Sequence, residues 1–266
     1  MSERKNWPLA VSVGFAVATD GEKLDELCAA GIKEIELSSG DLRPFFEYDF
    51  FKKSVEIVEF AKAHGVNISS VHLPFGPFSM IDGAYAENEL FTINLQIMIM
   101  EAAAKAGIKI AVIHPSGEPY KDEERAERLE CGCKVITSLT ENAKSLGIQL
   151  ALENLPRTCL CRDHMEMLYF LERIPDIKVC FDMNHNLSED NEDYIRAVAD
   201  RIITLHVSDY DFVDERHWLP GKGKVDWHRI VRVLEEVGYD GRFLYEIDWD
   251  GVTYADVAEN YRQLLS

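Results

Sequence analysis

Short apolar runs alternate with longer amphipathic stretches along the whole chain of 266 residues. The short runs are rich in β-branched and aliphatic residues, which is typical of buried strands. The stretches between them, such as FFKKSVEIVEFAKAHG and ENELFTINLQIMIMEAAAKAG, have the composition of helices. The expected strands are Leu9–Phe15, Ile32–Leu37, Val66–His72, Ile108–His114, Ile148–Glu153, Ile177–Asp182, Ile202–Val207 and Phe243–Ile247.

Glycines mark the ends of several expected helices, at Gly31, Gly65, Gly107 and Gly147, each just before the next strand. Glycine is favoured there because it takes the left-handed backbone conformation that ends a helix at little cost. Eight strand–helix units in about 250 residues predict a single (β/α)8 barrel, an α/β fold that spans residues 1–266 as one domain. A doubly wound open sheet is the alternative. It normally has a Gly-rich phosphate turn after its first strand, and the segment AVATDGEK has none.

The composition indicates in which environment the protein folds. Hydrophobic residues make up 47% of the chain, and no run approaches the roughly 18 apolar residues of a membrane span. We read no signal peptide at the N-terminus, so the six cysteines are expected to be reduced thiols in a cytoplasmic protein. The spacing of Cys159 and Cys161 is only a weak indication of a metal site, because no second such pair completes it.

The net charge is −19, from 47 acidic and 28 basic residues. A field of this sign repels a nucleic-acid backbone and offers no gain from counterion release. The charge therefore disfavours a nucleic-acid partner, although a few local cations could still hold a small anion.

Ionisable residues end every expected strand but the first, or follow it closely. Each one alone could be structural, as a hydrogen-bonded histidine or a salt-bridged glutamate. In a barrel, however, these strand ends converge on one mouth, where carboxylates would repel one another unless a cation neutralised them. The pattern therefore predicts a metal site. The residues are Glu36, His72, His114, Glu153, Asp182, His185, His206 and Glu246.

Four of these residues come from the last four strands and are the expected ligands: Glu153, Asp182, His206 and Glu246. Three carboxylates and one imidazole suit a divalent ion such as Mn²⁺, Zn²⁺, Co²⁺ or Mg²⁺. The set has no cysteine, which argues against a closed structural zinc site.

The segment after His206 reads VSDYDFVDERHWLPGKGKVDW, and we expect it to fold back across the mouth at Pro220-Gly221. Glu215 and His217 would then hang over the opening, where they could hold a second cation or a substrate hydroxyl. Arg216 and Lys222 could bind sugar hydroxyls or a phosphate, or could be solvated loop charges. The Gly-Lys-Gly piece lacks the spacing of a P-loop.

The stretches VHLP, VIHPS, LALENLP, FDMNH, LHVSD, ERHWLPGKGKVDW and YEIDW occur in this order from Val71 to Trp249. In this the chain resembles the xylose isomerase-like barrel superfamily, in particular its sugar phosphate isomerase/epimerase branch. The resemblance implies a metal-dependent isomerase or epimerase acting on a sugar or sugar phosphate. It also implies that Glu153 and Glu246 act as the acid/base pair as well as ligands.

Those residue types suit the implied chemistry. Removing a proton next to a carbonyl gives an enediolate, whose charge a cation stabilises, and two carboxylates can remove and return the proton. We expect His72, His114 and His185 to bind the substrate. The aromatic residues Trp7, Phe15, Phe75, Trp218 and Trp249 are expected near the mouth, as sugar-stacking or core residues.

The same superfamily includes endonuclease IV, a trinuclear zinc enzyme that cuts abasic DNA, and the chain also resembles its ligand set. His72, His114, Glu153, Asp182, His185, His206, His217 and Glu246 fall at matching motifs, so a second or third ion could bind. Glu215 departs from that pattern, which has Asp. The charge of −19 favours the sugar enzyme. A non-catalytic sugar-binding barrel is a further alternative, and barrels of this sort often form homo-oligomers.

Overall fold

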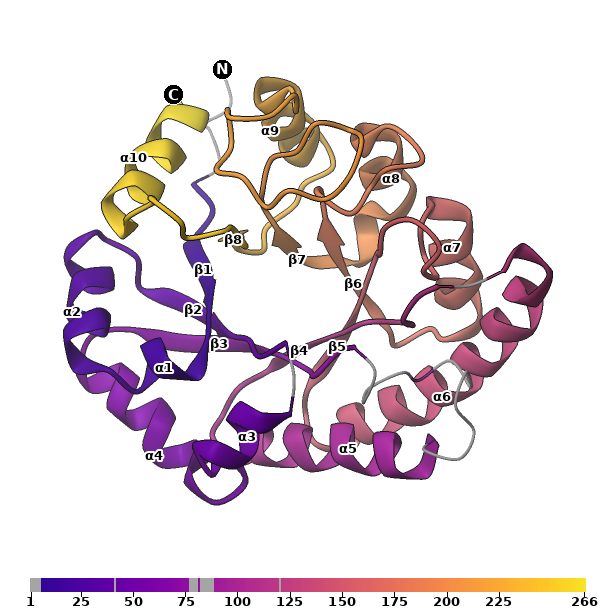
Figure 1. The fold of residues 1–266 in the computed structure, drawn as a ribbon, viewed down its shortest axis with the longest axis horizontal. Coiled ribbons are helices and arrows are strands. Elements are labelled where there is room, and N and C mark those ends of the chain that lie inside the picture. The colour runs from indigo at the N-terminus through magenta and orange to yellow at the C-terminus, as the bar shows by residue number, and fades with distance from the viewer. Residues whose placement is uncertain (1–5, 41, 77–80, 82–88, 120) are drawn as a thin grey trace.

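Eight parallel strands form the centre of the molecule, and helices surround them (Figure 1). The computed structural model describes residues 6–40, 42–76, 81, 89–119 and 121–266. The strands are β1 (Leu9–Val13), β2 (Glu34–Leu37), β3 (Asn67–His72), β4 (Ile110–Ile113), β5 (Gln149–Glu153), β6 (Lys178–Asp182), β7 (Ile202–His206) and β8 (Phe243–Tyr245).

The helices follow the strands along the chain. They are α1 (Phe15–Ala18), α2 (Gly21–Ala29), α3 (Arg43–Glu47), α4 (Phe50–Ala63), α5 (Glu89–Lys105), α6 (Arg125–Ser145), α7 (His164–Arg173), α8 (Asn191–Val198), α9 (Trp227–Glu236) and α10 (Tyr254–Leu264), with short 3₁₀ turns η2 (Asp122–Glu124) and η3 (Ala199–Arg201). Within the described ranges, no helix is long and apolar enough to cross a membrane.

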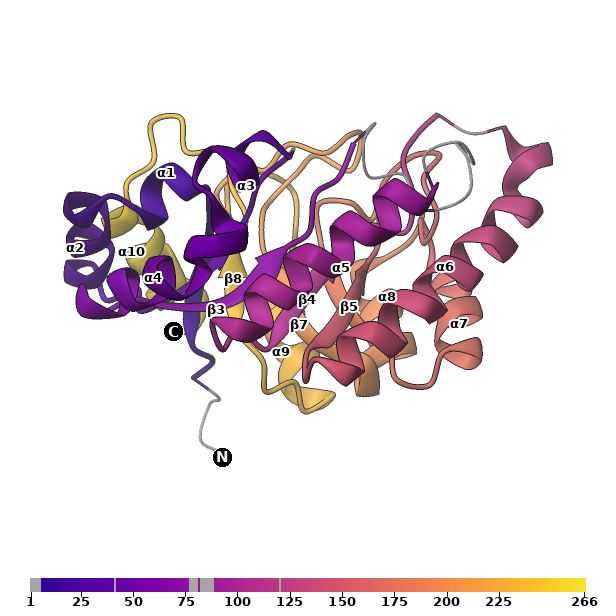
Figure 2. The same ribbon diagram turned by 90° about the horizontal axis from the view of Figure 1, so that it is seen from below.

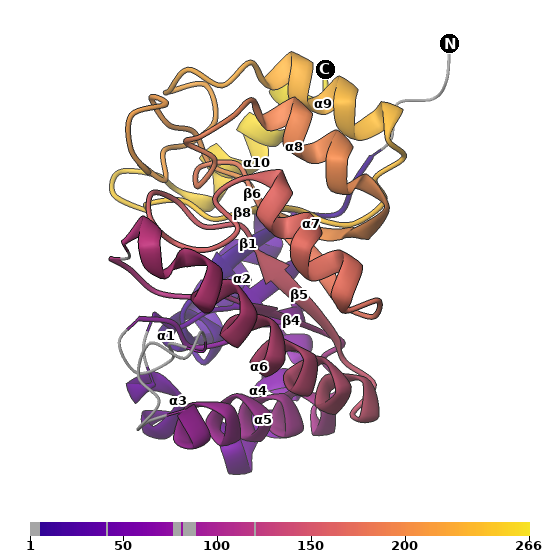
Figure 3. The ribbon, with the colours of Figure 1, turned by 90° about the vertical axis from the view of Figure 1, so that its right-hand side faces the viewer.

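The sheet closes on itself. Its strand order is β7-β6-β5-β4-β3-β2-β1-β8, and isolated bridges join Thr204 to Arg242 and Val207 to Tyr245 across the remaining gap. The loops that follow the strands gather at one end of this barrel, and the chain enters β1 from the other end (Figures 2 and 3). The expected (β/α)8 barrel is therefore confirmed, and the doubly wound alternative was wrong.

The strand ends differ slightly from expectation. The first strand stops at Val13, because Gly14 leads directly into α1 and Phe15 becomes part of that helix. The expected glycine positions are confirmed, since Gly31, Gly65, Gly107 and Gly147 all have left-handed φ angles, between 71° and 87°. The six cysteines are all free thiols, as expected.

Alternation along the strands brings the ionisable strand ends into the barrel interior. Val112, Ala151 and Cys180 form a small buried cluster that is separate from the large core of strand and helix residues. Side chains two positions apart on a strand point to the same face. The cluster therefore lies beneath the residues two positions further on, which are His114, just after β4, and Glu153 and Asp182, at the ends of β5 and β6.

One buried carboxylate organises the long connection from β7 to α9. Asp209 pairs antiparallel with Trp218, and its side chain accepts hydrogen bonds from Gly221 N at 2.7 Å, Val225 N at 3.1 Å and Trp227 Nε1 at 3.0 Å. The connection is thus folded back across the barrel mouth, as expected from its Pro-Gly turn. Gly223 lies against the same carboxylate, with no room for a side chain.

Replacing Gly223 with alanine should destabilise this connection. The added Cβ would lie 2.3 Å from both Asp209 Oδ1 and the Tyr210 carbonyl oxygen, so the backbone would have to shift. We expect a loss of about 2 kcal/mol in the free energy of unfolding, measured by urea denaturation. Gly14→Ala is the control, because its nearest neighbour, Ser38 O, is 3.8 Å away. Equal stabilities of the two variants would contradict this account.

Candidate active site

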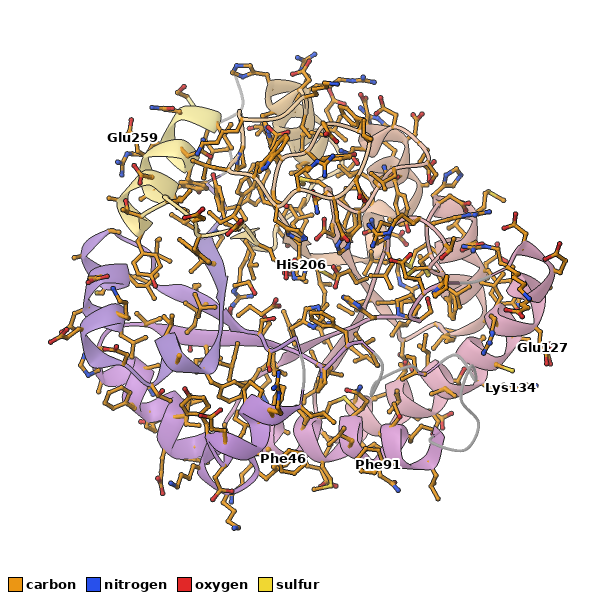
Figure 4. All side chains as sticks on the ribbon, viewed as in Figure 1. Phe46, Phe91, Glu127, Lys134, His206 and Glu259 are labelled. Carbon is orange, nitrogen blue, oxygen red and sulfur yellow. The ribbon has the colours of Figure 1, made fainter. Side chains whose placement is uncertain are left out.

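The four expected ligands meet at the mouth of the barrel. Glu153, Asp182 and His206 are the last residues of β5, β6 and β7, and Glu246 directly follows β8. One donor atom from each lies within 4.8 Å of the donor atoms of the other three. Figure 4 shows His206 near the middle of the ring of strands.

His206 lies at the centre of this four-residue cluster. Its Nδ1 lies 2.8 Å from Glu246 Oε2, 3.1 Å from Glu153 Oε1 and 3.7 Å from Asp182 Oδ2. Glu153, Asp182 and His206 are fully buried, whereas the Glu246 side chain keeps 21% of its surface exposed. The cluster is therefore closed from below and open to solvent on one side.

Asp182 offers a direct test of whether a cation fits. Its Oδ1 accepts hydrogen bonds from the backbone N–H of Asn184 at 2.6 Å and of His185 at 3.1 Å. Its Oδ2 is buried and has no hydrogen-bond partner among the described residues. A buried carboxylate oxygen without a partner is costly, so the donor set fits a divalent cation shared with the other three ligands.

Reciprocal hydrogen bonds fix the spacing of two of these ligands. Asn154 follows Glu153, and its amide nitrogen donates to Asp182 O at 2.7 Å. In return Asp182 N donates to Asn154 Oδ1, also at 2.7 Å. The ends of β5 and β6 are thereby held as one unit.

The charges of the cluster are strongly coupled. Burial alone would lower the pKa of His206, but Cys180 and the carboxylates of Glu246, Glu153 and Glu36 raise it well above its ordinary value. Burial would raise the pKa of Glu153, yet His206 and His114 bring it well below the ordinary value. Glu246 follows the same pattern, because His206 outweighs burial and lowers its pKa. The carboxylates of Glu153 and Glu246 are thus held as anions, which suits them to bind a cation.

Two further residues lie near the cluster. From the sequence, Glu36 was given no role of its own and Cys180 was not named. Glu36, on β2, is fully buried, and its Oε1 lies 3.0 Å from His206 Nε2. Cys180 also comes within ligand distance of Glu153 and His206, but burial raises the pKa of its thiol well above the ordinary value. The alternation along the strands predicts that both side chains point into the barrel. It does not predict which residues they contact across the barrel.

His72 and His114 hold the other oxygen of Glu153. Their Nε2 atoms lie 3.0 Å and 3.2 Å from Glu153 Oε2. His72 is buried, and its Nδ1 donates to Leu73 O at 2.8 Å, whereas His114 lines the pocket above. Of these two predicted substrate-binding histidines, the structure therefore brings His114 to the pocket and places His72 beneath it.

A second group of potential ligands lies beside the first. His185 Nε2 and His217 Nε2 are 3.2 Å and 4.0 Å from Glu215 Oε2. Arg157, which the sequence did not single out, also reaches Glu215 at 2.7 Å and pairs with Glu118 and Asp214. His185, with further help from Arg157, lowers the pKa of Glu215 to about 2 despite partial burial. The predicted second site is thus assembled, but its carboxylate already has a guanidinium partner.

A pocket of about 560 Å³ opens above the clusters. Arg216 and Lys222 do not line it: Arg216 pairs with Asp211 at 3.0 Å, and Lys222 is exposed on the turn after Pro220. The structure therefore does not bring either side chain to the pocket wall, and a role for them in substrate binding stays a prediction. The lining residues are Phe75, Gly76, His114, Ser116, Gly117, Glu118, Glu153, Leu155, Pro156, Arg157, Cys159, His185, Glu215, His217 and Glu246.

Of the five aromatic residues expected near the mouth, Phe75 lines this pocket, stacked on His114 with ring centres 4.6 Å apart. Trp7 precedes β1 and packs on Phe243 at the opposite end of the barrel, so its expected place was wrong. The weak metal candidates Cys159 and Cys161 are buried, and burial raises both thiol pKa values, that of Cys159 to about 12. Neither cysteine belongs to a group of potential metal ligands among the described residues.

The family model described as "Xylose isomerase-like TIM barrel" matches residues 24–266, and the chain belongs to this family. A D-psicose 3-epimerase of Enterocloster bolteae is 22% identical over 244 residues, covering 84% of this chain and 75% of that protein. A solved D-tagatose 3-epimerase-like protein has a TM-score of 0.80 at 20% identity, covering 97% of this chain and 98% of the other. A D-psicose 3-epimerase solved in the presence of D-fructose has a TM-score of 0.75 at 18% identity, covering 96% of each chain.

These matches confirm the expected family and enzyme class, an isomerase or epimerase. They do not favour the endonuclease IV-like alternative.

Adding MnCl₂ should raise the melting temperature of the protein and leave that of Asp182→Asn nearly unchanged. The amide keeps the Oδ1 acceptor but replaces the unpartnered oxygen with a donor that cannot bind a cation. At about 100 times the dissociation constant, the ion adds about 2.7 kcal/mol, or roughly 5–10 °C. Differential scanning fluorimetry measures this, and equal shifts in both proteins would contradict the assignment.

Proposed function

We propose that the chain is a divalent-metal-dependent sugar isomerase or epimerase that transfers a proton next to a carbonyl through an enediolate. The observation that carries this proposal is the unpartnered Asp182 Oδ2 inside a cluster with Glu153, His206 and Glu246. When bound there, the ion would supply positive charge for the developing negative charge on the sugar oxygens.

Glu153 and Glu246 are the proposed acid/base pair. Both line the pocket, and they come from different strand ends, β5 and β8, so they can approach a bound sugar from different directions. One group, as the carboxylate, would take the proton from the carbon next to the carbonyl. The other, as the carboxylic acid, would give its own proton to the opposite face and so invert that centre, which leaves the two groups with their protonation states exchanged. The lowered pKa values of Glu153 and Glu246 keep the group that acts as the base in its anionic form.

Other pocket residues are suited to hold the sugar. His114 and His185 present imidazole rings at the wall, where they can hydrogen-bond hydroxyl or carbonyl oxygens. Phe75 offers an apolar face beside His114, of the kind that packs against the C–H face of a sugar. This combination of a few directed polar groups and one aromatic face fits a small polyhydroxylated ketone.

The charge of the pocket favours an unphosphorylated sugar. Its acidic lining residues are Glu118, Glu153, Glu215 and Glu246, and Arg157 is the one lysine or arginine among the lining residues. Arg157 is already paired with Glu118, Asp214 and Glu215. Among the residues that the structure does not describe, residues 41, 77–80, 82–88 and 120 contain no lysine or arginine in sequence, and residues 1–5, which precede β1, contain Arg4 and Lys5. A phosphate, with a charge of about −2, would meet carboxylates here without a free cation.

An endonuclease IV-like phosphodiesterase acting on abasic DNA is the second candidate, and the group of His185, Glu215 and His217 is what favours it. A second ion there would sit beside the Arg157 guanidinium, which already compensates Glu215. The acidic rim and the net charge of −19 would also repel a DNA backbone. We therefore propose one tightly bound ion, a sugar substrate and, from the six free thiols, a cytoplasmic location.

The first functional test is proton exchange. In D₂O with Mn²⁺, we expect the protein to incorporate deuterium next to the carbonyl of one or more ketohexoses, followed by NMR. Removal of metal with EDTA should abolish exchange, and Glu153→Gln should lower its rate by about 10²–10⁴-fold, because an amide cannot take the proton.

Glu34→Gln is the matched control, because Glu34 lies on β2 and pairs with Arg242 away from the cluster. It should exchange deuterium like the unaltered protein. Metal-dependent nicking of abasic duplex DNA without any sugar exchange would reject the proposal in favour of the second candidate.

The second functional test concerns substrate charge. We expect kcat/KM to be at least tenfold higher for the accepted ketose than for its terminal phosphate ester. One unfavourable unit charge about 10 Å away costs roughly 1.7 kcal/mol at an effective dielectric constant of about 20. Raising the ionic strength should narrow the difference. A preference for the phosphate ester would overturn the argument from pocket charge.

A further inference from the structure

Glu36 is a fully buried carboxylate that the proposed reaction does not use. It lies on β2 in register with Ser12 of β1 and Ser70 of β3. Ser70 Oγ donates to Glu36 Oε2 at 2.8 Å, and Ser12 Oγ lies 3.5 Å from Oε1. The two neighbouring strands therefore hold this carboxylate in one orientation inside the barrel.

The held carboxylate points across the barrel to β7. Glu36 Oε1 lies 3.0 Å from His206 Nε2, while the other ring nitrogen, Nδ1, faces Glu153 and Glu246. Glu36 is therefore on the opposite side of the imidazole from the proposed cation. It cannot touch the substrate, because it is buried and does not line the pocket.

A neutral imidazole carries one N–H and one lone pair, and its partners decide which nitrogen has which. A carboxylate at Nε2 accepts the N–H and leaves the lone pair at Nδ1. Such an outer partner also fixes the plane of the ring and makes the ligating nitrogen more basic. These are the conditions under which His206 can bind a cation through Nδ1.

We infer that Glu36 is a positioning residue that holds the Nε2–H of His206 in a hydrogen bond and so leaves Nδ1 to bind a divalent cation. The inference rests on the proposed metal site and adds to it a residue that never contacts the ion. It separates two roles among the buried acids of the barrel. Glu153, Asp182 and Glu246 face the cation, and Glu36 sets the ring that completes their group.

Two substitutions of Glu36 distinguish a residue that positions the His206 ring from one that only fills space in the core. Glu36→Leu removes the acceptor at similar volume, and Glu36→Gln keeps an amide oxygen that can still accept the Nε2–H. We expect Mn²⁺ affinity, measured from the electron paramagnetic resonance signal of free Mn²⁺, to fall by about 10- to 100-fold in Glu36→Leu. Glu36→Gln should recover most of this loss, and Glu34→Gln should bind like the unaltered protein.

Long-range ¹H–¹⁵N spectra of ¹⁵N-histidine-labelled protein saturated with Zn²⁺ give a readout that needs no folded Glu36 variant. We expect the His206 signals, assigned by their loss in His206→Gln, to show the proton on Nε2. A proton on Nδ1, or unchanged Mn²⁺ affinity in folded Glu36→Leu, would overturn the inference alone. Absence of any Mn²⁺ or Zn²⁺ binding by the unaltered protein would overturn the proposed metal site and this inference together.

Discussion

The structure depends on the burial of several carboxylates around one imidazole at the mouth of a closed barrel. Glu153, Asp182 and Glu246 converge on His206 in a space that is open to solvent on the side of Glu246 and otherwise buried. Burying like charges together is unfavourable unless each finds a compensating partner. The surrounding residues meet this constraint in part. Imidazoles lie against Glu153, and backbone N–H groups donate to one oxygen of Asp182, while the other oxygen has no hydrogen-bond partner among the described residues.

The fold was predictable because its signals are local. Period-two apolar runs, helix composition and glycine at the helix ends repeat along the chain, and each repeat makes the same prediction. The candidate ligands were predictable for a related reason. In a barrel of parallel strands all the carboxyl ends meet at one face, so a residue at a strand end has a known destination once the fold is known.

The parts that escaped prediction depend on contacts between segments far apart in the sequence. Glu36 could be placed at a strand end, but its pairing with His206 joins β2 to β7 and has no sequence signature. Arg157 lies in a loop, and nothing near it indicates that it would connect Glu118 to Glu215. Conversely, Arg216 and Lys222 lie in a loop that does cross the mouth, but side-chain direction in an irregular segment is set by partners such as Asp211.

The paired hydrogen bonds between Asn154 and Asp182 have a consequence for ion selectivity. They hold the ends of the adjacent strands β5 and β6 at a fixed distance, and Glu153 and Asp182 extend from these strand ends. If the distance between these two carboxyl groups is fixed, a bound ion must match it within a small range of ionic radii. Ligands that cannot move apart would disfavour a large ion such as Ca²⁺. Discrimination among cations would then reside in two amide hydrogen bonds that lie outside the coordination sphere.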